Sequence, residues 1–263
     1  MGRAKNIVVR PIKSAEAVAL VRRVHYSGKV TQNSQLHLGV YFAGHLEGVM
    51  QFGPPLDRRK VLPLVRGTLW NQMLELNRIA FTDALPRNSE SRAMAVAFRM
   101  LRKHRPDIKW ILSFSDATQC GDGTIYRASG FRLTGIKAND GVYLLPDGRV
   151  VQRMTLEPAR PTPLQTQLRT LHNMPTQPAA ALIKAAGGKP IPGYQFRYIR
   201  FLDPAWRDRL TVPVIPFKDI PADARMYRGK KTRQPVQRGT EDHSATGGAE
   251  PTLTLHSQSG EVA

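Results

Sequence analysis

The fold is decided by residues 74–116, LELNRIAFTDALPRNSESRAMAVAFRMLRKHRPDIKWILSFSD. They begin with the alternation of a strand and lose its phase at Arg78, as a β-bulge would cause. Residues 88–104 predict a helix, because Asn88 or Ser89 can cap its start and basic residues fill its last turn. A buried strand follows at 109–116, so the stretch predicts a strand, a helix and a second, parallel strand.

The flanking sequence adds strands and helices around this unit. A strand at 6–12 leads into a helix at 14–28, and two apolar runs within 37–53 predict a hairpin. A short helix within 121–130 is followed by a strand and by a final hairpin that ends near 156. The predicted order, β-α-β-β-β-α-β-α-β-β, indicates one mixed α/β sheet with helices on its faces.

The composition changes after Leu156, and this change defines three predicted regions. We expect a catalytic domain at 1–156, a basic extension packed on or beside it at 157–217, and a largely disordered basic and polar tail at 218–263. Within the extension, residues 194–203 read as a strand in which aromatic and basic residues alternate.

The charge of the chain points to an anionic partner. Thirty-nine Lys and Arg against twenty Asp and Glu give a net charge of +19. A polynucleotide is the favoured partner, because its counterions are released on binding, and residues 194–201 and 225–238 are the candidate phosphate contacts. No apolar run approaches the ~18 residues that a membrane span needs, and the single cysteine, Cys120, reads as an inert small residue. We therefore expect a cytoplasmic protein without membrane contact.

Four polar residues are candidates for chemistry, each with a plainer alternative. Asp116 ends a buried strand, where α/β sheets place ligand-handling residues, but it could equally cap the next turn. His25 and Tyr26 end a helix; with Asp116 they would offer a nitrogen and two oxygens to a divalent first-row metal, although His25 could be a satisfied core residue. Arg78 could form a surface ion pair, or it could face an anionic or carbonyl substrate beside the bulge.

The order of elements is similar to that of the Gcn5-related N-acetyltransferases. In that fold two central strands splay apart and hold the acyl donor and the acceptor between them, and residues 124–131, TIYRASGF, resemble the segment that closes its core. Such enzymes cradle the coenzyme A pyrophosphate on a glycine-rich loop. Here Arg87, Asn88 and Ser89 stand in a stretch without glycine, so we expect them to form a donor site that serves a pyrophosphate poorly.

Three long stretches resemble the Mom family of bacteriophage DNA-modification proteins: 25–57, 74–98 and 109–137. The resemblance implies conversion of adenine in double-stranded DNA to N6-carbamoylmethyl (acetamido) adenine, which protects phage DNA from host restriction. It also implies ferrous iron, Fe2+, held by His25, Tyr26 and Asp116, with Arg78 and Tyr126 as further residues needed for activity. The adenine would be flipped out of the duplex.

The resemblance leaves the two-carbon donor open between acetyl-CoA and a glycyl-tRNA. Two other functions stay open at this stage. An ordinary acyl-CoA-dependent acetyltransferase would act on a protein or a small amine, and a non-enzymatic DNA-binding protein would need the charge alone. The DNA sequence preference and the oligomeric state are not encoded in any pattern that we find.

Overall fold

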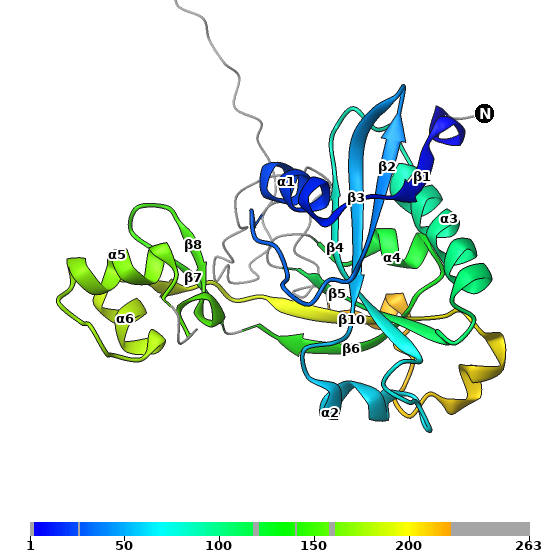
Figure 1. Ribbon diagram of the computed structural model, residues 1–263. Helices are drawn as coiled ribbons and strands as arrows, with labels where there is room; N and C mark the ends of the chain where they lie inside the picture. The colour runs from blue at the N-terminus through cyan, green and yellow to red at the C-terminus, as the bar shows by residue number, and fades with distance from the viewer. Residues whose placement is uncertain (1–2, 26, 118–120, 140, 158–160, 222–263) are drawn as a thin grey trace, which may run out of the picture.

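The computed structural model describes residues 3–25, 27–117, 121–139, 141–157 and 161–221. Its main body is a seven-stranded sheet of order β1-β2-β3-β4-β5-β10-β6 (Figure 1). The strands are β1 (Val8–Pro11), β2 (Leu36–Phe42), β3 (His45–Gly53), β4 (Met73–Phe81), β5 (Trp110–Asp116), β6 (Arg132–Ala138) and β10 (Tyr194–Phe201). All neighbouring strands are antiparallel except β4 and β5, so the predicted mixed sheet is confirmed.

Helices cover both faces of this sheet. On one face lie α1 (Ser14–Val24) and α2 (Arg58–Val61), and on the other lie α3 (Ser89–His104) and α4 (Thr124–Ala128) (Figure 1). Helix α1 is shorter than predicted, because its last residue is Val24 and His25 already has an extended backbone. Short 3-10 turns complete the body: η1 (Arg3–Asn6), η2 (Leu62–Leu64), η4 (Pro204–Arg209) and η5 (Phe217–Asp219). No helix in the described ranges is long and apolar enough to cross a bilayer.

Strands β4 and β5 separate after a short parallel contact. They pair only from Met73–Glu75 to Trp110–Leu112, although both strands continue. The Ser113 hydroxyl donates to the Leu76 carbonyl at 3.1 Å and makes the next link between them. On its other side β4 shifts register against β3 beside Gln51, which confirms the predicted bulge. The sheet therefore has the splay between its central strands that the sequence predicted.

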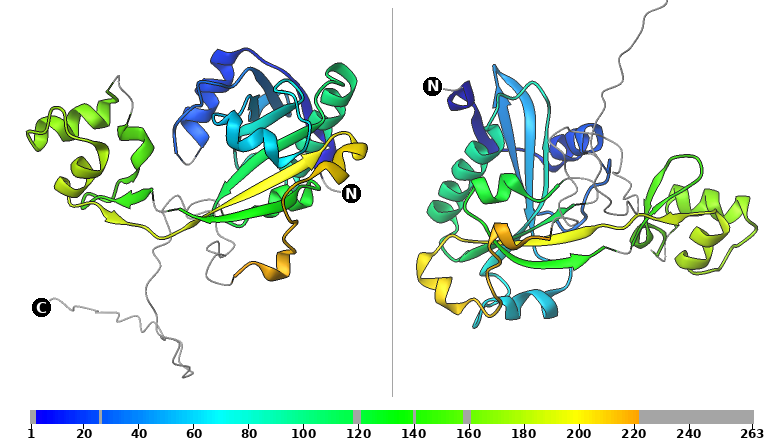
Figure 2. Two further views of the ribbon diagram at one scale, coloured as in Figure 1. Left: turned by 90° about the horizontal axis from the view of Figure 1, so that it is seen from below. Right: turned by 180° about the vertical axis from the view of Figure 1, so that it is seen from behind.

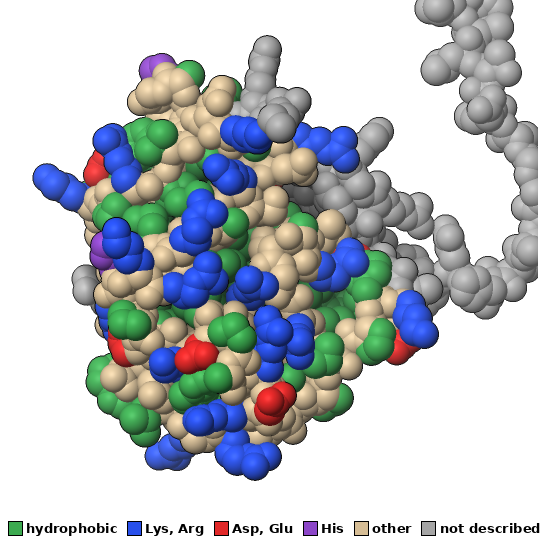
Figure 3. Space-filling view, turned by 90° about the vertical axis from the view of Figure 1, so that its right-hand side faces the viewer, with side chains coloured by type: hydrophobic (Ala, Val, Ile, Leu, Met, Phe, Trp, Pro, Cys, Tyr) green, Lys and Arg blue, Asp and Glu red, His purple; other side chains and the backbone are tan. Residues whose placement is uncertain are grey.

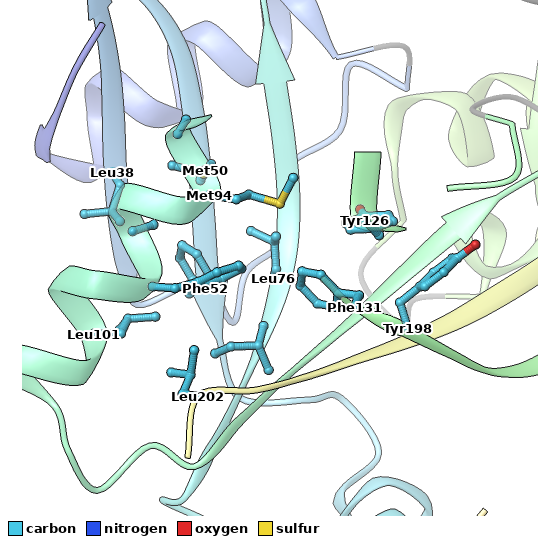
Figure 4. Close-up of a cluster of buried hydrophobic side chains, with 14 of the residues drawn as sticks. Leu38, Met50, Phe52, Leu76, Met94, Leu101, Tyr126, Phe131, Tyr198 and Leu202 are labelled. Carbon is cyan, nitrogen blue, oxygen red and sulfur yellow. The ribbon is translucent and has the colours of Figure 1, made fainter. Parts of the chain in front are cut away.

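The largest apolar cluster lies between the sheet and α3. Phe52 and Leu76 point from the strands toward Met94 and Leu101 of the helix, and Tyr126, Phe131 and Tyr198 extend the cluster toward α4 (Figure 4). The buried residues of α3 recur on one face of the helix and include Ala93, Met94, Ala97, Phe98 and Leu101. This packing fixes α3 against the splayed strands.

A smaller lobe stands off one end of the main sheet (Figure 2). It has a three-stranded sheet of order β8-β7-β9 and its own apolar cluster around Leu156, Leu168 and Leu182. Its elements are β7 (Val142–Leu144), β8 (Val150–Gln152), η3 (Arg153–Leu156), α5 (Pro163–Leu171), α6 (Ala179–Ala185) and β9 (Lys189–Pro190). The predicted boundary after residue 156 thus falls inside this lobe.

Strand β10 requires the main correction to the predicted domain organisation. We expected it in a basic extension, but it lies between β5 and β6 inside the main sheet. Its aromatic residues Phe196, Tyr198 and Phe201 are buried, and Arg197 donates to the Thr134 hydroxyl, so these four side chains are used inside the protein and not as phosphate contacts. The sequence predicted the strand but not its partners, because pairing with β5 and β6 spans the whole lobe. The predicted contacts at 225–238 and the tail from 222 onward lie outside the described residues.

Candidate functional site

Three predicted site residues lie on the α1 face of the sheet. Arg78 is two positions before Ala80, which packs with Val49 against α1. Asp116 is two positions after Phe114, which packs in the cluster around Trp110 on the same face. His25 directly follows α1, and the charge of the Arg78 guanidinium contributes to the lowered pKa of its ring. The splay therefore has Arg78 on its β4 side and Asp116 on its β5 side, with His25 on the covering loop.

His25 is held as a neutral imidazole. Burial and the nearby Arg78 charge lower the pKa of His25 from 6.5 to about 3. Its Nδ1 lies 2.8 Å from the Ser27 hydroxyl oxygen, and the Ser27 backbone N–H approaches the same atom at 3.2 Å. Because the Ser27 N–H donates to Nδ1, that nitrogen is an acceptor, and the single proton of the neutral ring lies on Nε2. His25 is therefore a neutral imidazole, which is the charge state that metals bind.

Arg78 holds the loop that follows α1. Its Nε donates to the Lys29 carbonyl at 3.1 Å, and its Nη1 donates to the carbonyl of Asn77 at 2.8 Å. The pKa of Lys29 is lowered, first by burial and then by the Arg78 charge. We predicted a cation that faces substrate; in the structure the Nε of Arg78 positions the segment that carries His25.

The same loop is fastened further along by its polar side chains. The Ser34 hydroxyl donates to Asn77 Oδ1 at 3.1 Å, and Asn33 donates its amide to the Pro54 carbonyl. Gly53 makes this approach possible, because a Cβ at that position would lie 2.0 Å from the Asn33 carbonyl oxygen. The loop after α1 is thus fixed on the bulge of β4 at both of its ends.

Asp116 is positioned by the strand that sequence analysis misplaced. It pairs in register with Gln195 of β10, and the next residue, Ala117, donates its N–H to the Tyr194 carbonyl at 2.8 Å. Asn139, just after β6, lies with its amide 3.4 Å from Asp116 Oδ1. The carboxylate therefore stands at a strand end whose backbone is held by β10 and whose side chain meets the β6 end.

Two further polar residues on this face were missed by the sequence analysis. Glu75 is the last β4 residue paired with β5. Burial raises its pKa, and this effect is larger than the opposite effects of a hydrogen bond from Asn77 and of the Arg78 charge. Gln51 is buried, pairs in register with Arg78, and its amide nitrogen lies 3.0 Å from His37 Nδ1. Both lie at positions of predicted strands that face into the protein. A polar residue at such a position indicates a candidate functional residue.

Tyr126 does not join this group. Its ring is buried on the α3 side of the sheet, with centroids 5.3 Å from those of both Phe131 and Tyr198 (Figure 4). Its hydroxyl lies 3.4 Å from the Phe114 carbonyl on β5. The structure thus places Tyr126 as a support for the end of β5, on the face opposite to Arg78 and Asp116.

The start of α3 differs from a pyrophosphate cradle. Asn88 adopts a left-handed backbone with φ of 70°, and the Ser89 N–H already bonds the Pro86 carbonyl at 3.1 Å. Ser89 is 0% exposed, whereas Arg87 is exposed. The first helical amide therefore already has a partner within the chain.

The proposed metal ligands are only partly described. Tyr26 and Cys120 lie outside the described residues. Within the ranges that the structure describes, no three His, Cys, Asp or Glu side chains gather closely enough to hold a metal. A neutral imidazole and a carboxylate are ligand types that Fe2+ accepts, so His25 and Asp116 fit such an ion in kind.

The strand order and the splay between β4 and β5 together define an acetyltransferase-like fold. The chain belongs to the Mom protein family, whose model matches residues 6–219. It is 31% identical over 219 residues to the methylcarbamoylase Mom of Escherichia phage Mu, across 83% of this chain and 85% of that protein.

Solved structures give a weaker likeness. The ribosomal-protein-S18-alanine N-acetyltransferase of Escherichia coli is 10% identical, with a TM-score of 0.41 over 75% of this chain and 94% of that one. An acetyltransferase of Bacillus cereus is 10% identical, with a TM-score of 0.39 over 74% of this chain and 99% of that one. The fold assignment rests on the strand order and the splay, not on these scores.

Proposed function

We propose that the protein is a phage DNA-modification enzyme that converts adenine in DNA to N6-carbamoylmethyl adenine. The modified base would protect the DNA from host restriction in the bacterial cytoplasm. The observation that carries the proposal is the 31% identity to the phage Mu methylcarbamoylase over 219 residues. The match to the family model covers residues 6–219 and so includes His25, Arg78 and Asp116. The net charge of +19 supports a polynucleotide substrate.

The chemistry has two requirements that this site can meet. The exocyclic amine of adenine is a poor nucleophile because its lone pair is delocalised, so the enzyme must activate the electrophile and accept the N6 proton. The base must also leave the duplex, which costs a few kcal/mol. Arg78 and Asn77 fix the loop that covers the splay, and a fixed loop keeps the reacting groups aligned.

His25, Tyr26 and Asp116 would hold Fe2+ in this proposal. Bound there, the ion would supply a positive centre that polarises the donor. The chain contributes the orientation of the ligands: Ser27 engages His25 Nδ1, and β10 fixes the strand end at Asp116. The low pKa of His25 keeps the imidazole neutral and competent for binding over the whole physiological range.

The donor that we favour is a glycyl-tRNA, with acetyl-CoA as the alternative. A glycyl group already has the carbon–nitrogen skeleton of the product, and the engaged amide at the start of α3 argues against the usual coenzyme A placement. Isotope-labelled glycine and acetate, supplied separately to expressing cells, distinguish the two. Label in the modified adenine from glycine alone supports the tRNA donor, and label from acetate alone overturns it.

The function itself is tested by expressing the protein with a plasmid and analysing the nucleosides by mass spectrometry. The wild type should give adenine enlarged by one C2H3NO unit, and Asp116→Asn should give none. Asp147→Asn, on the exposed β7–β8 turn, is the matched control and should modify normally. Unmodified adenine from the wild type, with acetylated protein or small amines instead, would show an ordinary acetyltransferase. DNA binding without any product would show a binding protein.

A further inference from the structure

Three arginines converge on the side of the molecule that carries α3 and η4, away from the site at the splay. Arg102 lies in the last turn of α3, Arg200 on β10, and Arg207 in η4. Figure 3 faces this side and shows Lys and Arg side chains across it with few acidic ones between them. We call Arg102, Arg200 and Arg207 the three-arginine cluster.

Arg200 is the fixed member of the cluster. Its Nη1 donates to the Gly130 carbonyl at 2.9 Å, and its guanidinium lies 5.9 Å from the Phe98 ring centroid. Gly130 has φ of 75°, and a Cβ there would lie 1.9 Å from Arg200 Nη1. Glycine at this position is therefore what allows the guanidinium to pack where it does.

The other two members of the cluster, Arg102 and Arg207, lie beside Arg200. Phe98 and Arg102 are four residues apart on α3 and share a helix face, so a guanidinium over Phe98 lies beside Arg102. Arg207 belongs to the 3-10 turn that directly follows β10. The pKa of Arg200 is lowered, first by burial and then by the charges of Arg102 and Arg207, which agrees with this convergence.

Two carboxylates of this region are paired with other bases. Asp107 pairs with Arg105 at 2.7 Å, and Asp203 pairs with Lys109 at 3.3 Å. Among the described residues, no carboxylate lies within ion-pair distance of any member of the three-arginine cluster. Three converging cations without an acid repel one another, and a bound anion would offset that repulsion.

We infer that the three-arginine cluster binds a phosphodiester group of duplex DNA, outside the site at the splay. Guanidinium groups match phosphate oxygens in pairs, and a fixed central arginine with two exposed neighbours can grip one backbone phosphate. Duplex DNA is the polynucleotide because the inference rests on the proposed function. Such a contact orients the duplex without reading its sequence.

The test compares Arg102→Ala/Arg207→Ala with Lys184→Ala/Lys189→Ala, an equal change in net charge on the small lobe. Binding of a labelled DNA duplex to the full-length protein is measured over a range of salt concentrations. The arginine variant should bind roughly ten-fold more weakly. The slope of log affinity against log salt should become shallower by about 1. The lysine variant should stay close to wild type.

Two checks keep this inference separable from the proposed function. Arg102→Lys/Arg207→Lys keeps the charge, so it should keep the wild-type salt slope and lose less affinity than the alanine variant, which excludes a folding defect. Nucleoside analysis of the same wild-type preparation reports the modification independently of binding. Equal affinity and slope for the arginine and lysine variants overturn the inference even when adenine is modified. A loss confined to a structured RNA competitor, with DNA binding unchanged, overturns it as well.

Discussion

The substitution Gly53→Ala tests whether the loop after α1 must rest on the β4 bulge. The added methyl would lie 2.0 Å from the Asn33 carbonyl oxygen and 3.0 Å from Asn77 Oδ1. Because the first of these contacts is with backbone, rotation of a side chain cannot relieve it. The loop must move away, and the side-chain hydrogen bonds of Asn33 and Ser34 move with it.

Overpacking of a dense region costs about 1–3 kcal/mol. Each hydrogen bond lost adds about 1 kcal/mol. With the bonds of Asn33 and Ser34 both broken, the free energy of unfolding should fall by about 3–5 kcal/mol. Urea unfolding followed by circular dichroism measures this change. Modification activity should fall in parallel, because the displaced loop carries His25.

Gly44→Ala is the matched control on the same hairpin. Gly44 has φ of 85° with nothing within 4 Å of the added Cβ, so its cost is the backbone term alone, about 1–2 kcal/mol. If Gly53→Ala costs no more than Gly44→Ala and keeps full activity, the loop does not depend on this contact and the account of the site is refuted.

Three further perturbations probe the buried polar groups. Burial raises the pKa of Glu75, so the stability that its neutral form contributes is lost as pH rises. Glu75→Gln should therefore be more stable than the wild type at pH 7, and the difference should close as pH falls toward 4.5. Equal stability of the two proteins in urea at both pH values would contradict this prediction. The pKa of His25 is about 3, below its ordinary value of 6.5, so its contribution to stability is present above pH 6.5 and is lost as pH falls. NMR chemical shifts of the imidazole should show that His25 is still neutral at pH 5. A titration midpoint near 6.5 would disprove its burial. Gly130→Ala should destabilise the protein through its left-handed backbone, with φ of 75°, and through the Arg200 contact; Arg200→Ala should remove only the second part in a double-mutant cycle, whereas fully additive costs would show that the two residues do not meet.

Local sequence patterns predicted most elements of the fold but not all of their neighbours. The helix α3, the hairpin of β2 and β3, and the bulge beside Arg78 depend on residues close in sequence, and all are confirmed. The predicted cap of α3 is wrong, because Asn88 has a left-handed backbone and its side chain makes no cap hydrogen bond. The position of β10 could not be read in the same way, because its partners lie on the far side of a whole lobe. Nothing in the strand itself distinguishes an inner from an outer position.

The candidate site shows the same division. Asp116 at a strand end and Arg78 at a bulge follow from local patterns, and the structure places both on the α1 face. Tyr126 was grouped with them by resemblance, yet α4 packs on the other face and buries it there. Glu75 escaped notice because a single carboxyl in an apolar strand has a clear meaning only once the point of splay is known.

The most direct test of the central claim measures nucleosides from plasmid DNA recovered with the wild type, His25→Ala and Asp116→Asn. All three proteins are first shown to be folded and to bind duplex DNA equally. The account predicts adenine enlarged by C2H3NO with the wild type and unmodified adenine with both variants. Modified adenine from either variant at the wild-type level would contradict the site, and unmodified adenine from the wild type would contradict the function.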